Sequence, residues 1–306
     1  MAFASLLLAL VAQFAYPPRE RTSLAALYGR LCLSTAKRLN AGDRNSGVFA
    51  YGAMVLAVLV PLGIVAALAS SIHAVVLVAL DVAILHASLR FLPTTSALAD
   101  IERSLREGDV HAAGNRLAEW QGELPGTQDA GSLARLAAEH GLREAHQGTF
   151  AILFWFLVLP GPLGAVLYPL TLRAARQWDL GAAPDERDFG WFAGRALHVL
   201  DCVPQRVTAF VFAIVGDFED ALLCWRSQAA QWLRPEEGIV LASGAGALGV
   251  RLGEPLARGD ALIDRPTLGT GEGAGEETLA SLEGMLWRAM SLYLLAYLFA
   301  SLLSFA

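Results

Sequence analysis

The sequence predicts an all-α integral membrane protein, a polytopic bundle of about five to six transmembrane helices with helical cytoplasmic loops. Of the 306 residues, 55% are hydrophobic and only 17% are charged, whereas soluble domains carry roughly 25% charged residues. The mean hydropathy is +0.46, and the apolar residues are clustered in long runs rather than spread along the chain. The formal net charge of -6, without a basic patch, argues against nucleic acid as a partner.

Residues 1–92 are predicted to hold the first membrane helix, a basic amphipathic loop and a transmembrane hairpin. Residues 2–16 form an apolar run that lacks the basic start of a signal peptide, so we expect an uncleaved helix. Residues 19–46 have an excess of Lys and Arg, which favours the cytoplasmic side for this loop. Residues 48–68 and 72–92 are the two arms of the hairpin.

The second arm of this hairpin carries three ionisable residues, Asp81, His86 and Arg90. Charged side chains at membrane depth are costly unless water or a partner satisfies them. Two interpretations stay open. The side chains either pack inside the bundle and extend to the cytoplasmic edge, or they line a polar cavity.

Residues 93–147 are predicted to form a cytoplasmic loop of three helices. Gly108 suits the end of the first helix, and Asp109 suits the N-cap of the second. Glu144 and His146 follow the third helix, next to the point where the chain becomes apolar. Such a pair could act in acid–base chemistry or bind a metal. Capping of a helix N-terminus at the membrane interface is the alternative role.

Residues 148–216 are predicted to hold a broken helix and a polar membrane segment. The apolar run at 150–173 is interrupted by Pro160-Gly161-Pro162. A discontinuous helix leaves backbone groups free at membrane depth, where they can bind ions or polar ligand groups. A kinked span whose free carbonyls are met by neighbouring helices is the alternative.

The polar membrane segment follows a loop at residues 174–195 that is rich in aromatic side chains, as is typical of a membrane interface. Residues 199–216 then return the chain across the membrane and carry Asp201 and Arg206. Ionisable residues inside an apolar segment are a functional-site hypothesis in themselves. We therefore include both side chains among the candidate site residues.

Residues 217–284 are predicted to be a Gly-rich cytoplasmic region. Gly244, Gly246 and Gly249 match the G-x-G-x-x-G pattern of dinucleotide sites, but no βαβ pattern surrounds them. A Gly-rich turn that presents backbone N–H groups beside Arg251 could still bind an anion. The predicted segments are 1–92, 93–147, 148–216, 217–284 and 285–306, the last being a C-terminal membrane helix.

The three cysteines, Cys32, Cys202 and Cys224, show neither CxxC nor CxxH spacing. Their odd number and irregular spacing predict neither a disulfide framework nor a zinc site. The motifs therefore predict no metal site, and no cofactor is evident from them.

Several segments resemble the CobD/CbiB/AmpE superfamily of inner-membrane proteins. GALGVRLG, followed by ARGDALIDRPTLGTG, resembles the C-terminal signature of the CobD/CbiB branch, the membrane enzymes of cobalamin biosynthesis. GDVHAAGNRL is similar to that branch's GDL-x-x-AR segment, and FAILFWFLVLPGPLGAVLY to its APLFW…G-PGA-x-Y segment. ALHVLDCVPQRVTAFVFAIVGDFEDAL is closer to the AmpE branch, an inner-membrane protein linked to β-lactamase regulation. These segments cover most of residues 90–270, in the family's order.

Three places depart from the enzymes of the cobalamin branch. Their VGRDT motif is replaced by QGELPGT, and Gln147 stands where their acidic motif before the FW segment has an aspartate. Leu197 and His198 stand where those enzymes have paired aspartates, which leaves Asp201 as the nearby acid. Enzymes of that branch use ATP, whose phosphates and Mg²⁺ are handled by acids. The departures therefore remove acids that would be expected to hold Mg²⁺.

The resemblance implies a multi-pass protein of the bacterial inner (plasma) membrane, with the lipid bilayer as a partner. Its first functional expectation is an AmpE-like non-catalytic modulator or sensor with a membrane or cytoplasmic protein partner. The alternative is a divergent adenosylcobinamide-phosphate synthase of cobalamin (vitamin B12) biosynthesis, which joins aminopropanol to a corrinoid carboxylate with ATP and Mg. Under this alternative the catalytic residues are Glu144, His146 and Asp201, and the ligand-binding residues are Arg206, Gly244, Gly246, Gly249 and Arg251.

Overall fold

The computed structural model describes residues 2–16, 24–127, 129–180, 187–232, 234–258 and 261–303. Within these residues the fold is helical with five strands of two or three residues, which confirms the all-α prediction. The chain forms two compact units, and each unit takes in separate stretches of the sequence. Unit 1 comprises Met1–Leu89, Gly148–Val203 and Ala296–Ala306, and unit 2 comprises Arg90–Gln147 and Pro204–Leu295. The five predicted segments, which follow chain order, stay a prediction.

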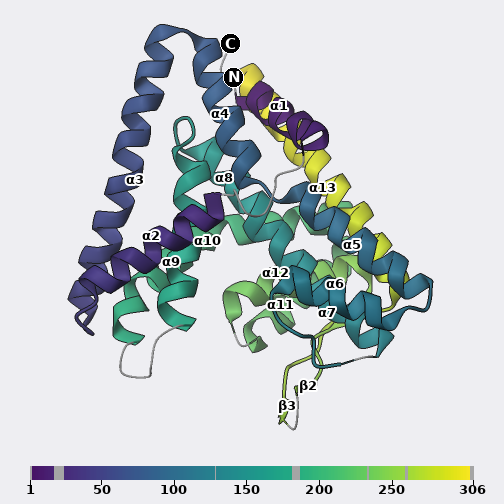
Figure 1. Cartoon of the computed structure of the whole chain (residues 1–306). Coiled ribbons are helices and arrows are strands. Elements are labelled where there is room, and N and C mark those ends of the chain that lie inside the picture. Colours follow the sequence, from purple (N-terminus) through teal and green to yellow (C-terminus); the bar gives the residue numbers. More distant parts are fainter. Residues whose placement is uncertain are drawn as a thin grey trace. The chain divides into compact units, whose positions relative to one another are not determined.

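Unit 1 contains the predicted hairpin. Helix α3 (Arg44–Ile72) and helix α4 (Ala74–Ser88) contact each other and are joined at His73, whose backbone is extended (Figure 1). The side chain of His73 accepts a hydrogen bond from the backbone N–H of Val75, so this residue also caps the start of α4. The hairpin confirms the expectation of two apolar arms joined by a very short turn.

Helix α1 (Ala2–Ala15) packs against α4 within unit 1. Gln13 is the one amide in this apolar helix, and its Nε2 donates to the carbonyl oxygens of His86, at 3.2 Å, and Leu89, at 2.8 Å. The last carbonyls of a helix have no N–H partner within the helix. The buried Gln13 side chain therefore supplies the hydrogen bonds that the C-terminal end of α4 lacks.

The Pro-Gly-Pro break separates α8 (Ala151–Val158) from α9 (Leu163–Leu180), as the sequence predicts. The two helices pack against each other. A Cβ atom at Gly164 would lie 2.0 Å from the carbonyl oxygen of Trp155, so only glycine permits this close approach. Because α8 and α9 pack against each other on either side of the break, the run is a helical hairpin rather than one interrupted span.

Helix α10 (Arg187–Val215) is continuous through Pro204. A proline has no N–H to offer to the carbonyl four residues earlier, which here is that of Leu200. The indole Nε1 of Trp155 donates to this carbonyl oxygen at 3.0 Å and so replaces the missing bond. The expectation of a loop at residues 174–195 is wrong for the described part of that range, because α9 continues to Leu180 and α10 begins at Arg187.

Helix α2 (Leu24–Leu39) is the amphipathic helix predicted in the basic loop, and it packs against α3 and α9. Its buried face includes Tyr28 and Cys32, and burial raises the pKa of the Cys32 thiol to about 11. Its exposed side chains include Arg30, Lys37 and Arg38. The apolar cluster that α2 completes consists of Tyr28, Cys32, Ala50, Tyr51, Met54, Val166, Leu170, Ala174, Ala175, Trp178, Phe189 and Ala193.

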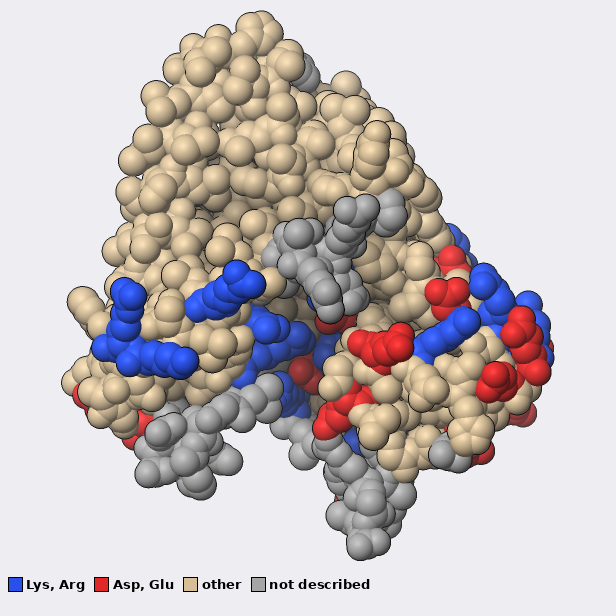
Figure 2. All heavy atoms as spheres, in the orientation of Figure 1, with Lys and Arg blue, Asp and Glu red and all other residues tan. Residues whose placement is uncertain are grey.

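Only some of the described helices are long and apolar enough to cross a membrane. Figure 2 shows Lys and Arg gathered over α2 and the beginning of α3, while the remaining length of α3 carries no charged side chain. Helix α1 has 14 residues and is shorter than a usual span. Among the described residues, four helices are long and apolar enough to cross a membrane, rather than the five to six predicted: Arg44–Ile72, Ala74–Arg106, Asp188–Val215 and Glu276–Leu303.

Unit 2 contains the three helices predicted between residues 93 and 147. Gly108 has a φ of +76° after the first of them, and Asp109 accepts a hydrogen bond from the N–H of Ala112 at 2.8 Å as the predicted N-cap. Asp129 caps the third helix in the same way. The helices of this unit are α5 (Phe91–Arg106), α6 (Val110–Gln121), α7 (Ala130–Ala145), the part of α10 from Pro204 onward, α11 (Phe218–Gln228), a 3₁₀ turn (Ala229–Gln231), α12 (Pro235–Leu248) and most of α13 (Glu276–Leu303).

Five short strands follow α12 in unit 2, where the sequence predicted a Gly-rich loop. β1 (Val250–Leu252) pairs antiparallel with β4 (Leu268–Gly269) and parallel with β5 (Glu272–Gly273). β2 (Leu256–Arg258) and β3 (Ala261–Ile263) form an antiparallel hairpin that projects from the helices of this unit (Figure 1). Strands of two or three residues are too short for the alternation of apolar and polar residues that predicts a strand.

Candidate functional site

A π-helical turn, His146–Phe150, follows α7 directly and leads into α8. No pattern in the sequence predicted this turn. π-helical turns are rare and occur frequently at functional sites. Glu144 and His146 lie at its start, and both side chains are buried. Residues two apart in a helix do not face each other, so these two side chains contact different neighbours.

Glu144 faces α5 and forms an ion pair with Arg90, whose Nε lies 3.3 Å from Glu144 Oε2. The side chain of Glu144 is 11% exposed and that of Arg90 is 43% exposed. Arg90 is therefore the partly exposed member of the pair, and Glu144 is the nearly buried one. Glu144 Oε2 faces the Arg90 guanidinium but accepts no hydrogen bond of good geometry within the described residues.

His146 faces α10 instead. Its Nδ1 lies 2.9 Å from Thr208 Oγ1, and both side chains are buried. Which of the two atoms carries the proton depends on the tautomer of the imidazole. Gln205 lies one turn before Thr208 on the same face of α10, is 2% exposed, and its Oε1 has no hydrogen-bond partner within the described residues. Thr208 and Gln205 were not among the predicted site residues.

The two predicted site residues on α10 differ in their surroundings. Asp201 belongs to unit 1, where its buried Oδ1 accepts a hydrogen bond of 2.9 Å from the hydroxyl of Tyr168 on α9. Arg206 belongs to unit 2, and its side chain is exposed. A buried carboxylate bound to a tyrosine hydroxyl is held in one orientation, whereas the Arg206 side chain lies at the surface of its unit.

The Gly-rich turn predicted at Gly244, Gly246 and Gly249 is not a turn. Gly244 and Gly246 lie inside α12, and Gly249 is its left-handed C-cap with a φ of +66°. A Cβ atom at Gly246 would lie 2.5 Å from the carbonyl oxygen of Asp220 on α11, so this glycine allows close helix packing. Its backbone N–H is used within the helix. Of this predicted group, Arg251 is exposed on β1.

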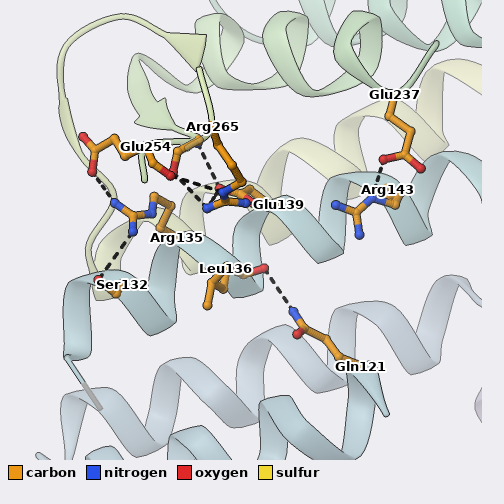
Figure 3. Close-up of polar contacts among 10 residues, drawn as sticks. Gln121, Ser132, Arg135, Leu136, Glu139, Arg143, Glu237, Glu254 and Arg265 are labelled. Carbon is orange, nitrogen blue, oxygen red and sulfur yellow. Dashed lines mark hydrogen bonds and ion pairs between the residues drawn. The ribbon is translucent and has the colours of Figure 1, made fainter. Parts of the chain in front are cut away.

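The sequence did not predict a buried ion-pair network in unit 2, which we call the α7 clamp and define as Arg135, Glu139, Glu254 and Arg265 (Figure 3). Arg265 Nη1 donates to Glu139 Oε2 at 2.7 Å, and the N–H of Gly253 donates to Glu139 Oε1 at 2.9 Å. The side chain of Glu139 is 3% exposed and that of Arg265 is 10% exposed. Arg135 forms an ion pair with Glu254 one turn earlier on α7.

The α7 clamp fixes the loop after β1. Arg265 Nη2 also donates to the carbonyl oxygen of Gly253 at 3.1 Å, and Arg265 Nε donates to that of Glu254 at 3.2 Å. Gly253 and Glu254 have φ values of +80° and +65°, and Glu254 is the non-glycine residue with a positive φ among the residues described. Left-handed backbone at a residue with a Cβ is unfavourable, so these bonds hold a conformation that the loop would not adopt by itself.

Within the described residues no group of three or more His, Cys, Asp and Glu side chains could hold a metal ion. An all-protein metal cage therefore does not fit these residues. Mg²⁺ that is held by substrate phosphates needs only one or two protein carboxylates.

The model of the CobD/Cbib protein family matches residues 5–286 of this chain. A cobalamin biosynthesis protein CobD of Stutzerimonas stutzeri (strain A1501) is 33% identical over 286 residues, which cover 92% of each chain. The protein of the same name from Chromobacterium violaceum is 37% identical over 200 residues, 63% of each chain. That of Brucella suis biovar 1 is 29% identical over 205 residues, 63% of this chain and 61% of that protein. No solved structure matches this chain.

These matches extend beyond the segments on which the resemblance was based, because they begin near the N-terminal helix and reach into α13. The names of the relatives favour the cobalamin alternative over the regulatory expectation. The chain is a membrane protein of the CobD/CbiB family.

Proposed function

We propose that this protein acts in cobalamin biosynthesis at the bacterial inner membrane as a divergent adenosylcobinamide-phosphate synthase. It would join the amine of an aminopropanol unit to a carboxylate of a corrinoid. The observation that carries the proposal is the 33% identity to a cobalamin biosynthesis protein CobD across 92% of both chains. The proposal replaces the non-catalytic modulator as the first hypothesis.

Amide formation between a carboxylate and an amine has two chemical requirements. The carboxylate must be activated, which ATP supplies by phosphorylating it while Mg²⁺ offsets the phosphate charge. The amine must lose its proton before it can attack the activated carbon, and the phosphate then leaves. The chain must therefore bind two anionic groups and provide a base near the amine.

Glu144 is the residue that we assign as the base. Its Oε2 accepts no hydrogen bond within the described residues and is paired with Arg90, so it can accept the ammonium proton of the aminopropanol unit once Arg90 has turned to a substrate anion. Arg90, with a side chain 43% exposed, is placed beside it to bind the corrinoid carboxylate or a phosphate. Under this proposal Arg90 aligns the reacting groups, and Glu144 removes the proton.

His146 and Thr208 have a positioning role in this proposal. Their 2.9 Å contact ties the π-helical turn to α10 and so fixes the direction in which Glu144 leaves the helix. Arg206 is a second exposed cation for an anionic substrate group. Asp201 accepts a hydrogen bond from the Tyr168 hydroxyl, and we expect this bond to hold its carboxylate in one orientation.

The test is formation of the amide product by the full-length protein purified in detergent. ATP, Mg²⁺, a corrinoid acid and aminopropanol phosphate are supplied, and the product is detected by mass spectrometry. Glu144→Gln keeps the size of the side chain and removes the base, so we expect kcat/KM to fall by about 10²–10⁴-fold. Glu119→Gln is the matched control, because Glu119 is exposed on α6 and takes no part in the site.

A folded wild-type protein that forms no product, and that fails to restore growth of a cobalamin auxotroph lacking this enzyme, would contradict the proposal. The replacement of an expected aspartate by Gln147 would then favour the non-catalytic modulator. If the product forms but Glu144→Gln retains full activity, the reaction stands and the assignment of the base is wrong.

A further inference from the structure

Asp81 is a carboxylate in the apolar helix α4 of unit 1. Its side chain is 4% exposed and lies on the face of α4 that is buried together with Leu85 and Ser88. The helix belongs to a candidate membrane span with a mean hydropathy of 2.0. A charge in such surroundings is costly and is a functional-site hypothesis by default.

The neighbours of Asp81 satisfy only one of its two oxygens. Ser5 Oγ on α1 donates to Oδ2 at 3.4 Å, and this serine is fully buried. Oδ1 has no hydrogen-bond partner, and Asp81 forms no ion pair with the residues that the structure describes. The N-terminal ammonium of the chain acts on this carboxylate electrostatically, but Oδ1 itself receives no hydrogen bond, which is costly for a buried carboxylate oxygen.

The second oxygen faces the Pro-Gly-Pro turn. A Cβ atom at Gly161 would lie 4.0 Å from Asp81 Oδ1, and Gly161 has a φ of +60°. No side chain of residue 161 therefore stands between the turn and the carboxylate. Pro160 and Pro162 have no N–H, so the turn offers carbonyl oxygens and few donors. It also follows the C-terminal end of α8, where unpaired carbonyls carry partial negative charge.

These groups are all oxygen ligands. We propose that Asp81, Ser5 and the backbone carbonyls of the turn between α8 and α9 form a binding site for a monovalent metal cation within unit 1. One carboxylate neutralises a single positive charge. A divalent ion would need more acids, and no group of three metal-binding side chains occurs among the described residues. The proposal is independent of the proposed enzymatic function.

The test is the thermal unfolding of the full-length protein in detergent, followed by tryptophan fluorescence. NaCl, KCl and choline chloride are compared at constant ionic strength. We expect a saturable rise of the midpoint with sodium or potassium but not with choline. The rise should be about 5 °C at a hundred-fold excess of the cation over its dissociation constant. The sodium and potassium series identify which cation the site prefers.

Asp81→Asn keeps the shape of the side chain and should abolish the cation-dependent shift, while Ser5→Ala should raise the cation concentration needed for half of it. Asp188→Asn is the control, because Asp188 is an exposed acid of unit 1 and should leave the shift intact. Equal midpoints in all three salts, or a full shift in Asp81→Asn, would overturn the proposal.

Equilibrium binding of radioactive sodium and rubidium to the wild-type protein provides a measurement that does not depend on any variant. About one bound ion per chain is expected for at least one of the two. Binding at background level for both would overturn the proposal, and Asp81 would then be neutralised by a proton.

Discussion

The Glu139–Arg265 ion pair of the α7 clamp allows a quantitative prediction for Glu139→Ala. This change removes the carboxylate that accepts hydrogen bonds from Arg265 Nη1, at 2.7 Å, and from the backbone N–H of Gly253, at 2.9 Å. It leaves a guanidinium that is 10% exposed without its counter-charge, and breaking a buried pair in this way costs about 3–5 kcal/mol. Arg265 keeps its contacts with two backbone carbonyls and with the ring of Trp232, 5.6 Å away, which favours the lower limit, about 3 kcal/mol.

The measurement is urea unfolding in detergent, followed by tryptophan fluorescence. The double variant Glu139→Ala/Arg265→Met removes the stranded charge and should be more stable than Glu139→Ala alone. Asp100→Ala is the control, since its pair with Arg103 is exposed and should contribute less than about 1 kcal/mol. A loss below about 1 kcal/mol for Glu139→Ala, or a double variant less stable than the single one, would refute the reasoning.

Three further predictions concern single contacts. Trp155→Phe removes the donor to the Leu200 carbonyl, so the free energy of unfolding should fall by about 1–3 kcal/mol; an unchanged value would mean that this carbonyl finds another donor. Glu254→Gly and Glu254→Ala both remove the ion pair with Arg135, but only glycine adopts the φ of +65° without strain. The glycine variant should therefore be about 1 kcal/mol more stable than the alanine variant. Equal unfolding midpoints of the two variants in urea would contradict this. Hydrogen bonds from the N-terminal end of α7 hold the pKa of Asp129 below its ordinary value. The contribution of Asp129 to stability, about 1 kcal/mol, is therefore present above the unfolded-state pKa and lost as the pH falls through the folded-state pKa. The free energies of unfolding of wild type and Asp129→Ala should converge in acid. A difference between them that does not depend on pH would contradict the N-cap role.

The parts of the fold that the sequence predicted correctly depend on local signals. Asp109 and Gly108 determine the boundary between α5 and α6 through an N-cap and a left-handed turn, and both act over a few residues. The hairpin of α3 and α4 follows from two apolar runs with almost nothing between them. Such features need no knowledge of the rest of the chain.

The parts that were missed depend on distant residues or on ambiguous ones. Glu139 and Arg265 are 126 positions apart, so no spacing in the sequence links them. Gly246 was interpreted as part of a turn because glycine is common there, whereas its role is to let α12 approach α11. Glu144 and His146 were predicted as a pair, but they are two residues apart on a helical segment and contact different neighbours, Arg90 and Thr208. The role of a glycine or of a pair of polar residues can be inferred only once the helix that contains it, and the neighbours of that helix, are known.

The hydrogen bonds that Gln13 gives to α4 have a consequence for how the protein is made. Helix α1 leaves the ribosome before α4, so its amide is already available when the carbonyls of His86 and Leu89 emerge. An end of a helix with unsatisfied carbonyls is poorly tolerated in lipid. A helix that is synthesised earlier thus acts as an assembly partner for a later one, and a fusion or deletion that displaces α1 should reduce the yield of inserted protein.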